Sequence, residues 1–337
     1  LEHFSKALSL NEELGNNRGI GTNLSNIGIV YENQGDYPRA LEYYFKYLRL
    51  NEKLGNKIGI AMSLSNIGNV YNDQKDFNTA LEYFSKALSL YEELQNKNGI
   101  AGNFNNIGII YSQKGDYSKA LEYYFKALSM YQEIGNKNNM PTIFNNIGNI
   151  YSKQFDYFNA LDYYFKALRL NEEIGNNEKM ATNLANIGRV YTHQRKYQLA
   201  EDYLLKALDV SLAISVLYLI KDVNETLSEL YAQTNRYQLA YVHYKQYTTA
   251  KDSLFNEDKS KEIGRLEMQH EIETAEMERK RKADEEFKIK TQKTERRNLL
   301  EYSGMVIGLL IIGLFVTLLG FVKVKPWVAE GITFFAF

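Results

Sequence analysis

The chain of 337 residues contains no cysteine. This absence excludes disulfide bonds, cysteine-ligated zinc or iron–sulfur sites and thiol catalysis, although it does not decide the compartment. Proline is rare as well, with 3 residues against 22 glycines, which suits long uninterrupted helices. Neither sign of charge dominates, because 40 Lys and Arg are matched by 41 Asp and Glu. We therefore expect no nucleic-acid partner.

Sequence motifs of catalysis are missing too. There is no GxxxxGK[ST] phosphate loop and no GxSxG nucleophile elbow, and the GxG at Gly19–Gly21 falls in a predicted connector between repeats. The spacing of the histidines does not suit a metal site. They are His3, His193, His243 and His270. We therefore assign no catalytic residue, no metal and no cofactor within these residues.

The most conspicuous feature of the sequence is an internal repeat of forty residues. The phrase LEYYFKYLRLNEKLGN begins at Leu41, and the chain opens on its counterpart LEHFSKALSLNEELGN. A second phrase, NLSNIGIVYENQGDY, begins at Asn23 and alternates with the first. No insertion interrupts five copies. A fixed period of this length is typical of solenoids and related repeat architectures.

Both phrases have helical periodicity. In the second phrase, apolar residues or glycine recur at steps of three, one and three, which places them on one face of a helix. These positions are Leu24, Ile27, Gly28 and Tyr31. The turn that follows contains Gly and Asp, and the next helix starts near Pro38. Each copy is thus a helical hairpin that cannot cover its own apolar face. Stacked copies would form an all-α solenoid.

The pattern Leu24-x-x-Ile27-Gly28-x-x-Tyr31, followed by Ala40-x-x-x-Tyr44, resembles the tetratricopeptide repeat. The copies depart from the usual form because Leu or Phe replaces the first Trp and a connector six residues longer replaces the closing Pro. In this they are similar to the forty-residue repeats of kinesin light chain and of the G-protein-signalling modulators. The resemblance covers the chain from Leu1 to about Asp252 and implies a right-handed solenoid that binds another protein or a peptide in its concave groove.

We divide the chain into five parts. Residues 1–19 hold the second helix of a truncated repeat, and residues 20–252 form a solenoid of about six repeats, of which the last is divergent. Residues 253–302 are a charged helical linker, residues 303–322 a transmembrane helix, and residues 323–337 a short turn with the start of a second transmembrane helix. Because Leu1 falls inside a helix and is not Met, we expect a signal peptide or further repeats to precede it.

The segment before the predicted span is strongly charged. Residues 256–302 contain 12 Lys and Arg and 13 Asp and Glu, with only fragments of an apolar stripe, so a coiled-coil homodimer through them stays an open alternative. Residues 303–322 carry no charge, and their 20 residues would span about 30 Å as a helix, the thickness of a bilayer core. Charges flanking the span favour a cytoplasmic solenoid. The order of the parts instead resembles bacterial tetratricopeptide sensors, which implies an extracytoplasmic one.

Asparagine returns at one place in the first helix of five repeats, about 200° around from Leu24 and therefore on a predicted exposed face. These ladder residues are Asn26, Asn66, Asn106, Asn146 and Asn186. Asn inside a helix costs roughly half a kcal/mol relative to Ala, so its return needs a reason. Recent duplication, hydrogen bonds between adjacent repeats and a ligand-binding groove are three open interpretations. The groove would also include Asn69, Asn149 and Arg189.

Two other repeated residue types receive a structural interpretation. Tyr31 and its counterparts are expected in the core, and Gly28 and its counterparts are expected where paired helices cross closely. The sequence as a whole favours a membrane-anchored protein that binds a partner segment in its groove. The alternative is the sensor half of a signalling enzyme, such as a histidine kinase or a nucleotide cyclase, whose catalytic domain would follow Phe337.

Overall fold

The computed structural model describes residues 1–321, apart from the side chain of Glu2 and some side chains within 257–276 and 316–321. Every regular element in this part of the chain is an α-helix. The helices are α1 (Glu2–Glu13), α2 (Asn17–Asn33), α3 (Tyr37–Leu54), α4 (Lys57–Asp73), α5 (Phe77–Glu93), α6 (Lys97–Gln113), α7 (Tyr117–Glu133), α8 (Met140–Lys153), α9 (Tyr157–Ile174), α10 (Asn177–His193), α11 (Tyr197–Ala213), α12 (Leu217–Gln233) and α13 (Tyr237–Phe321). The predicted all-α solenoid is confirmed.

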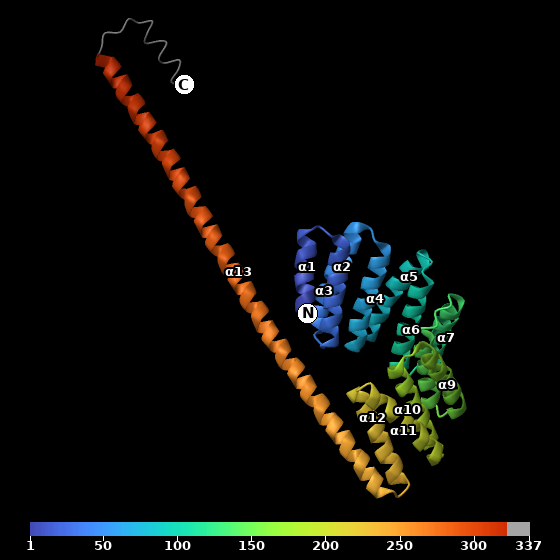
Figure 1. Cartoon of the computed structure of the whole chain (residues 1–337). Coiled ribbons are helices and arrows are strands. Elements are labelled where there is room, and N and C mark those ends of the chain that lie inside the picture. Colours follow the sequence, from blue (N-terminus) through green and yellow to red (C-terminus); the bar gives the residue numbers. More distant parts are fainter. Residues whose placement is uncertain (322–337) are drawn as a thin grey trace. The chain divides into compact units, whose positions relative to one another are not determined.

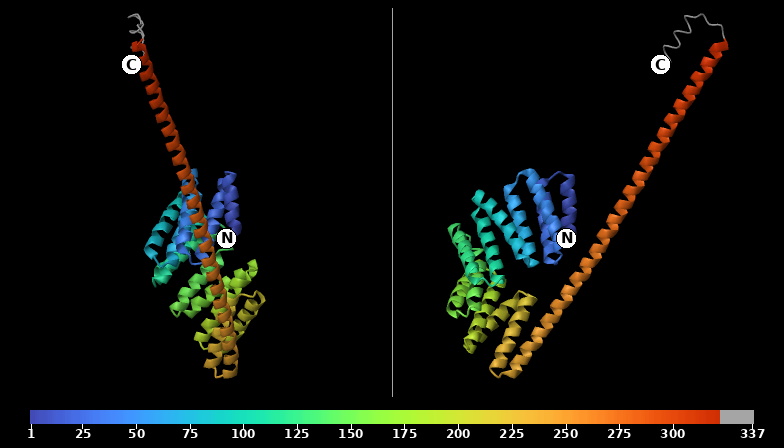
Figure 2. Two further views of the ribbon diagram at one scale, coloured as in Figure 1. Left: turned by 90° about the vertical axis from the view of Figure 1, so that its left-hand side faces the viewer. Right: turned by 180° about the vertical axis from the view of Figure 1, so that it is seen from behind.

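Successive helices from α1 to α12 lie side by side as antiparallel pairs (Figures 1 and 2). The even-numbered helices are the first helices of the repeats, and the odd-numbered ones are the second helices. They belong to a compact unit that extends from Leu1 to Glu262. The buried clusters of this unit draw on α1 to α12 and the first turns of α13, so the unit has a core of its own and is expected to fold alone.

Capping side chains mark where most of these helices begin. The side chain of Asp36 accepts a hydrogen bond from the backbone N–H of Arg39 at 3.3 Å, and that of Asn56 accepts one from Gly59 at 3.2 Å. Such caps satisfy backbone donors that have no partner in the first turn. The capping residues are Asp36, Asp76, Asp116 and Asp156 for second helices, and Asn16, Asn56, Asn96 and Asn176 for first helices.

Most connectors between repeats are shorter than the sequence suggested, although six residues separate α7 from α8. Helix α4 ends at Asp73, α5 covers Phe77–Glu93 and α6 begins at Lys97, so each turn holds three residues. Two helices of 17 residues and two such turns make up the forty-residue period. The predicted longer connector is therefore wrong, because the additional residues lengthen the helices. The GxG at Gly19–Gly21 likewise lies inside α2.

Glycine inside the first helices allows close contact with a large side chain of the second helix. A Cβ atom on Gly148 would lie 2.6 Å from the ring of Tyr164, and one on Gly188 would lie 2.6 Å from Leu204. Gly28, Gly68 and Gly108 face Tyr44, Phe84 and Tyr124 in the same way. The predicted close crossing is confirmed, and it explains why a residue that weakens helices recurs there.

The repeated tyrosines of the first helices lie partly at the edge of the core. Tyr31 and Tyr231 are buried as expected, but their four counterparts are half-buried. Each of these four stacks on a tyrosine of the next helix with ring centroids 5.5–5.7 Å apart. The stacked pairs are Tyr71–Tyr83, Tyr111–Tyr123, Tyr151–Tyr163 and Tyr191–Tyr203. Full burial was therefore a wrong expectation for the four.

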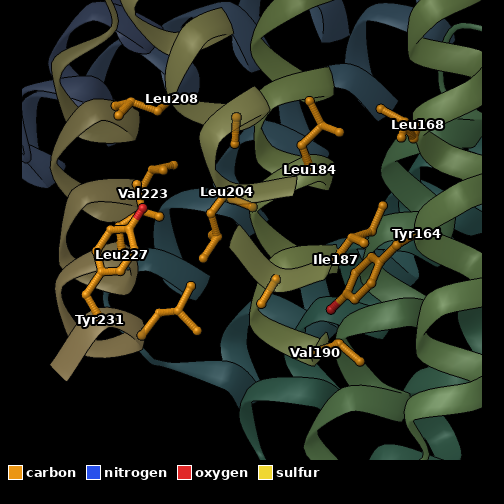
Figure 3. Close-up of a cluster of buried hydrophobic side chains, with 14 of the residues drawn as sticks. Tyr164, Leu168, Leu184, Ile187, Val190, Leu204, Leu208, Val223, Leu227 and Tyr231 are labelled. Atoms are coloured by element: carbon orange, nitrogen blue, oxygen red, sulfur yellow. The ribbon is translucent and has the colours of Figure 1, made fainter. Parts of the chain in front are cut away.

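Buried side chains from neighbouring repeats interlock along the solenoid. In the cluster of Figure 3, Tyr164 and Leu168 from α9 lie beside Ile187 from α10, while Leu204 from α11 lies near Leu227 from α12. Each of these side chains is at least nine-tenths buried. The apolar face of one hairpin is thus covered by the next, as a quasi-one-dimensional core requires.

Helix α13 runs from Tyr237 to Phe321 without a helix end at residue 252 or 302, where we placed domain boundaries. The second compact unit begins at Ile263. Among the described residues, one stretch, Met277–Phe315, contains a helical window long and apolar enough to cross a membrane, with a mean hydropathy of 1.7. The last residue of the predicted span and the predicted turn with the second span, residues 322–337, lie outside the described residues.

The glycine contact predicts a pair of opposite stability changes. Gly148→Ala should lower the free energy of unfolding of residues 1–262 by about 1–2 kcal/mol, because overpacking against Tyr164 outweighs the gain of about 1 kcal/mol in helix propensity. Gly102→Ala is the matched control, since its nearest neighbour would be 3.8 Å away, and it should raise stability. Urea denaturation measures both. Equal changes in the two variants would contradict the proposed role of the contact.

Candidate functional site

First helices from successive repeats line a cavity of about 360 Å³. Its lining comes from α6, α8 and α10, with one tyrosine each from α7 and α9. The lining residues are Ile109, Ser112, Gln113, Tyr124, Asn146, Asn149, Ser152, Lys153, Tyr164, Asn186, Arg189 and His193. Four of the eight predicted groove residues, namely Asn146, Asn149, Asn186 and Arg189, therefore come together here. We call this cavity and the one described next the groove.

A second cavity, of about 590 Å³, shares Arg189 and His193 with the first. It is lined by α10, by α12, and by the turn before α11 with the first residue of that helix. Its lining residues are Arg189, Thr192, His193, Arg195, Tyr197, Asp222, Glu225, Thr226, Glu229 and Gln233. The groove thus extends over the last four first helices of the solenoid. The remaining predicted residues, Asn26, Asn66, Asn69 and Asn106, lie on α2, α4 and α6 outside both cavities.

The asparagine ladder is half-buried, which corrects its predicted exposure. Its amides reach the neighbouring repeat, because adjacent first helices approach closely on that side. Asn146 Nδ2 donates to Asn105 Oδ1 at 3.0 Å, and Asn186 Nδ2 donates to Asn145 Oδ1 at 2.9 Å. Asn106 Nδ2 donates to Asn69 Oδ1 at 3.1 Å. A longer contact of 3.5 Å joins Asn66 Nδ2 to Ser25 Oγ. Hydrogen bonding between repeats, the second of the three interpretations, is therefore present.

Arg189 joins α10 to α12. Its guanidinium donates to Asn186 Oδ1 at 2.8 Å and to Thr226 Oγ1 at 3.4 Å, and it forms an ion pair with Asp222. About one third of the Arg189 side chain stays exposed, so the arginine also presents its charge to the groove. Only this repeat carries an arginine at the position that Asn69 and Asn149 occupy in earlier repeats.

Neutral donors form the deeper wall of the first cavity. The hydroxyl of Tyr164 donates to Asn149 Oδ1 at 2.7 Å. Burial raises the pKa of Tyr164 to about 12, so the hydroxyl stays protonated at neutral pH. Burial raises the pKa of Tyr124 in the same way. This wall can therefore offer hydrogen bonds without carrying a net charge.

Charge is distributed unevenly along the groove. Lys153 lines the first cavity, Arg189 lines both, and Arg195 lines the second together with Glu225 and Glu229. Amides and hydroxyls supply most of the other polar groups. The groove can thus bind a polar chain segment by hydrogen bonds and orient it by charge.

Sequence reasoning missed several lining residues. Ser152, Lys153 and His193 lie three or four positions after Asn149 or Arg189, so the helical period could have identified them. The acidic residues of α12 were missed because the divergent last repeat lacks the asparagine pattern. Tyr124 and Tyr164 are the counterparts of Tyr44 in later repeats, and only the packed structure shows that their edges reach the cavity.

The forty-residue period, the paired helices and the continuous stacked core define an α-solenoid repeat protein. Family models of the tetratricopeptide repeat match residues 24–58, 59–133 and 139–213, which together make up more than half of the chain. The chain belongs to the tetratricopeptide repeat family. Among curated proteins, no sequence matches it.

Several solved structures are similar to the chain at low identity. BtubC (BKLC) from P. vanneervenii has a TM-score of 0.57 and 19% identity, over 64% of this chain and 91% of that chain. A signal transduction ATPase with a tetratricopeptide repeat sensor from Pyrococcus horikoshii has a TM-score of 0.61 and 18% identity, over 77% of this chain and 41% of that chain. A Rap protein complexed with competence and sporulation factor has a TM-score of 0.53 and 17% identity, over 70% of this chain and 76% of that chain. Identities this low establish a shared fold alone.

The ladder bonds predict a measurable coupling between repeats. In a double-mutant cycle, Asn145→Ala and Asn186→Ala should show a coupling of about 0.5–1.5 kcal/mol in the free energy of unfolding, because the bond between their amides contributes only when both are present. Asn26→Ala combined with Asn186→Ala is the control, since these residues lie in distant repeats and should be additive. A cycle without coupling would remove the structural role of this bond.

Proposed function

We propose that the protein is a membrane-anchored scaffold that binds a segment of a partner protein in the groove. The observation that carries this proposal is the meeting of Asn146, Asn149, Asn186 and Arg189 in one cavity that continues into a second. Tetratricopeptide repeat proteins bind other proteins or peptides, and the first helices of the repeats line this cavity. The groove therefore has both the position and the chemistry of a peptide-binding surface.

The bonds between repeats leave hydrogen-bonding capacity for a ligand. An asparagine amide has two N–H donors and an oxygen with two lone pairs, and the bond from Asn146 to Asn105 uses one donor of Asn146. The structural and ligand-binding interpretations of the ladder are therefore compatible. An extended segment exposes backbone N–H and C=O groups at every residue, and these groups match the amides and hydroxyls of the groove.

The charges of the groove favour one kind of segment. Glu225 and Glu229 suit a lysine or arginine of the partner, whereas Lys153 and the exposed part of Arg189 suit an acidic side chain or a backbone carbonyl. A partner with a basic residue a short distance from an acidic or neutral one would satisfy both. The similar Rap structure, titled as a complex with competence and sporulation factor, supports the general mode of binding at the level of fold only.

The proposed anchor is the apolar segment near the end of α13. Leu309, Leu310 and Leu314 are each more than six-tenths exposed, and they lie within a stretch that carries no charge. A soluble protein rarely exposes so large a continuous apolar surface, whereas a bilayer would cover it. The anchor would hold the groove near a membrane. The charges that flank the span favour the cytoplasmic side, whereas the family resemblance implies the extracytoplasmic side.

The anchor predicts how the chain partitions. The full chain should stay with membranes after an alkaline carbonate wash, whereas residues 1–262 should be soluble, because the described apolar window lies beyond Glu262. Immunoblotting of the membrane and soluble fractions measures both. Recovery of the full chain in the soluble fraction without detergent would refute anchoring.

The groove predicts a loss of binding in selected variants. Peptides selected from a random library against residues 1–262 should bind Arg189→Ala and Asn149→Ala about five-fold more weakly, since one hydrogen bond contributes about 1 kcal/mol. Arg169→Ala is the matched control, because Arg169 lies on α9 with its side chain 82% exposed. Isothermal titration measures affinity, and a thermal melt of each variant excludes unfolding. Equal binding by all three variants would place the peptide site elsewhere.

A further inference from the structure

The turns within the repeats place one residue of each repeat in the left-handed backbone region. These residues are Gly35, Lys75, Gly115, Phe155, Arg195 and Asn235, with φ between 58° and 78°. Gly is the residue best suited to this conformation, and a bulky aromatic residue is poorly suited. Phe155 therefore occupies a strained position, and it does so in an otherwise closely repeated sequence.

Phe155 and the nearby Phe158 bury little of their surface in the protein. Phe155 is 77% exposed and Phe158 is 82% exposed. In the earlier repeats the position of Phe158 is held by Pro38, Asn78 and Ser118, so neither phenylalanine belongs to the repeating pattern. The ring of Phe155 meets that of Tyr157 edge-on at 6.3 Å. Neither Phe155 nor Phe158 contributes to a buried core, so the strain at Phe155 and the exposure of both rings call for another explanation.

The next turn departs from the pattern in a complementary way. Lys196 stands where four earlier repeats have the capping aspartate, and α11 has no side-chain cap as a result. A cation at a helix N-terminus is also unfavourable for the helix dipole. Arg195 and Lys196 are both exposed. The second turn thus gives up stability and gains positive charge.

The two turns are held next to each other. The ring of Tyr157 stacks on that of His193 at 5.9 Å with an angle of 5° between planes, which links the start of α9 to the end of α10. The carboxylate of Asp156 is engaged by the backbone N–H and the side-chain amide of Asn159, at 3.2 and 2.7 Å. We call Lys153, Phe155, Phe158, Arg195 and Lys196 the aromatic–basic patch.

We propose that the aromatic–basic patch binds the surface of an anionic lipid bilayer. Two adjacent turns each accept a local cost in stability, and together they combine exposed aromatic rings with exposed cations. Aromatic rings insert at the level of lipid headgroups, and lysine and arginine are attracted to negatively charged lipids. The exposed phenylalanine rings can insert among lipid headgroups, and the positive charge of the patch complements the negative charge of an anionic bilayer.

Lys153 and Arg195 of the patch also line the groove, but Phe155, Phe158 and Lys196 do not, and binding to a bilayer can be tested without the transmembrane segment. Residues 1–262 form a unit with its own core and contain no tryptophan, because Trp327 is the one tryptophan of the chain. Phe158→Trp therefore provides a single fluorescent reporter. Its emission should shift to the blue on addition of phosphatidylglycerol–phosphatidylcholine vesicles, and much less with phosphatidylcholine alone. Added salt should weaken the response.

Matched variants separate binding from folding. Ile134→Trp places the reporter in the turn after α7, between two repeats, and should show no shift. In the Phe158→Trp background, Phe155→Gly and Lys196→Asp restore residues found at these positions in other repeats. Each should raise the melting temperature, and the two together should weaken binding to the anionic vesicles at least tenfold in cosedimentation. A purely structural role for these residues would instead lower the melting temperature.

Three outcomes would overturn the proposal. The first is equal binding to anionic and neutral vesicles, or binding to neither. The second is unchanged vesicle binding when Phe155→Gly and Lys196→Asp are combined. The third is a concentration-dependent dimer in analytical ultracentrifugation that Phe155→Gly abolishes while the parent shows no vesicle binding, which would assign the patch to a second copy of the chain.

Discussion

The contact between a helix glycine and a large side chain of the following helix sets the geometry of each repeat. Because Gly148 has no Cβ, the ring of Tyr164 can lie directly on the backbone of α8. The same contact recurs in the preceding repeats, and Leu204 takes the place of the ring in the last regular one. Hairpins of equal geometry can stack in register, and their apolar faces then cover one another. The ladder, the groove and the turns all depend on that register.

Register explains why one set of asparagines can serve two purposes. An amide about 200° from the apolar stripe would be exposed on an isolated helix, but the neighbouring repeat brings an acceptor within 3.0 Å of Asn146. Half-burial of Asn146 and Asn186 leaves part of the hydrogen-bonding capacity of these two amides facing the groove. Hydrogen bonds between repeats thus offset the cost of asparagine inside a helix. Ligand binding is therefore not needed to explain why asparagine recurs at these positions.

Departures from the repeat are informative because the remaining sequence is so regular. Arg189 replaces an asparagine and joins α10 to Asp222 on α12, which gives the groove a charged end. Phe155 and Lys196 replace residues that suit their turns better, and both are exposed. Neither kind of departure improves the core. Such sites distinguish one solenoid from another, since the repeated positions are largely committed to packing.

The sequence by itself determined the helical hairpin, the forty-residue period and the stacked solenoid, because burial of an apolar stripe depends on local periodicity. It also predicted eight groove residues, of which Asn146, Asn149, Asn186 and Arg189 line one cavity, whereas the other four lie outside both cavities. It misjudged the connectors, since capping by Asn16 and Asn56 extends helices through residues that look like linker. Only the tertiary structure decided that the ladder bonds neighbouring repeats, that Tyr164 reaches the cavity, and that the acidic residues of α12 continue it. These features depend on distances between helices, and helical periodicity within one chain segment does not specify them.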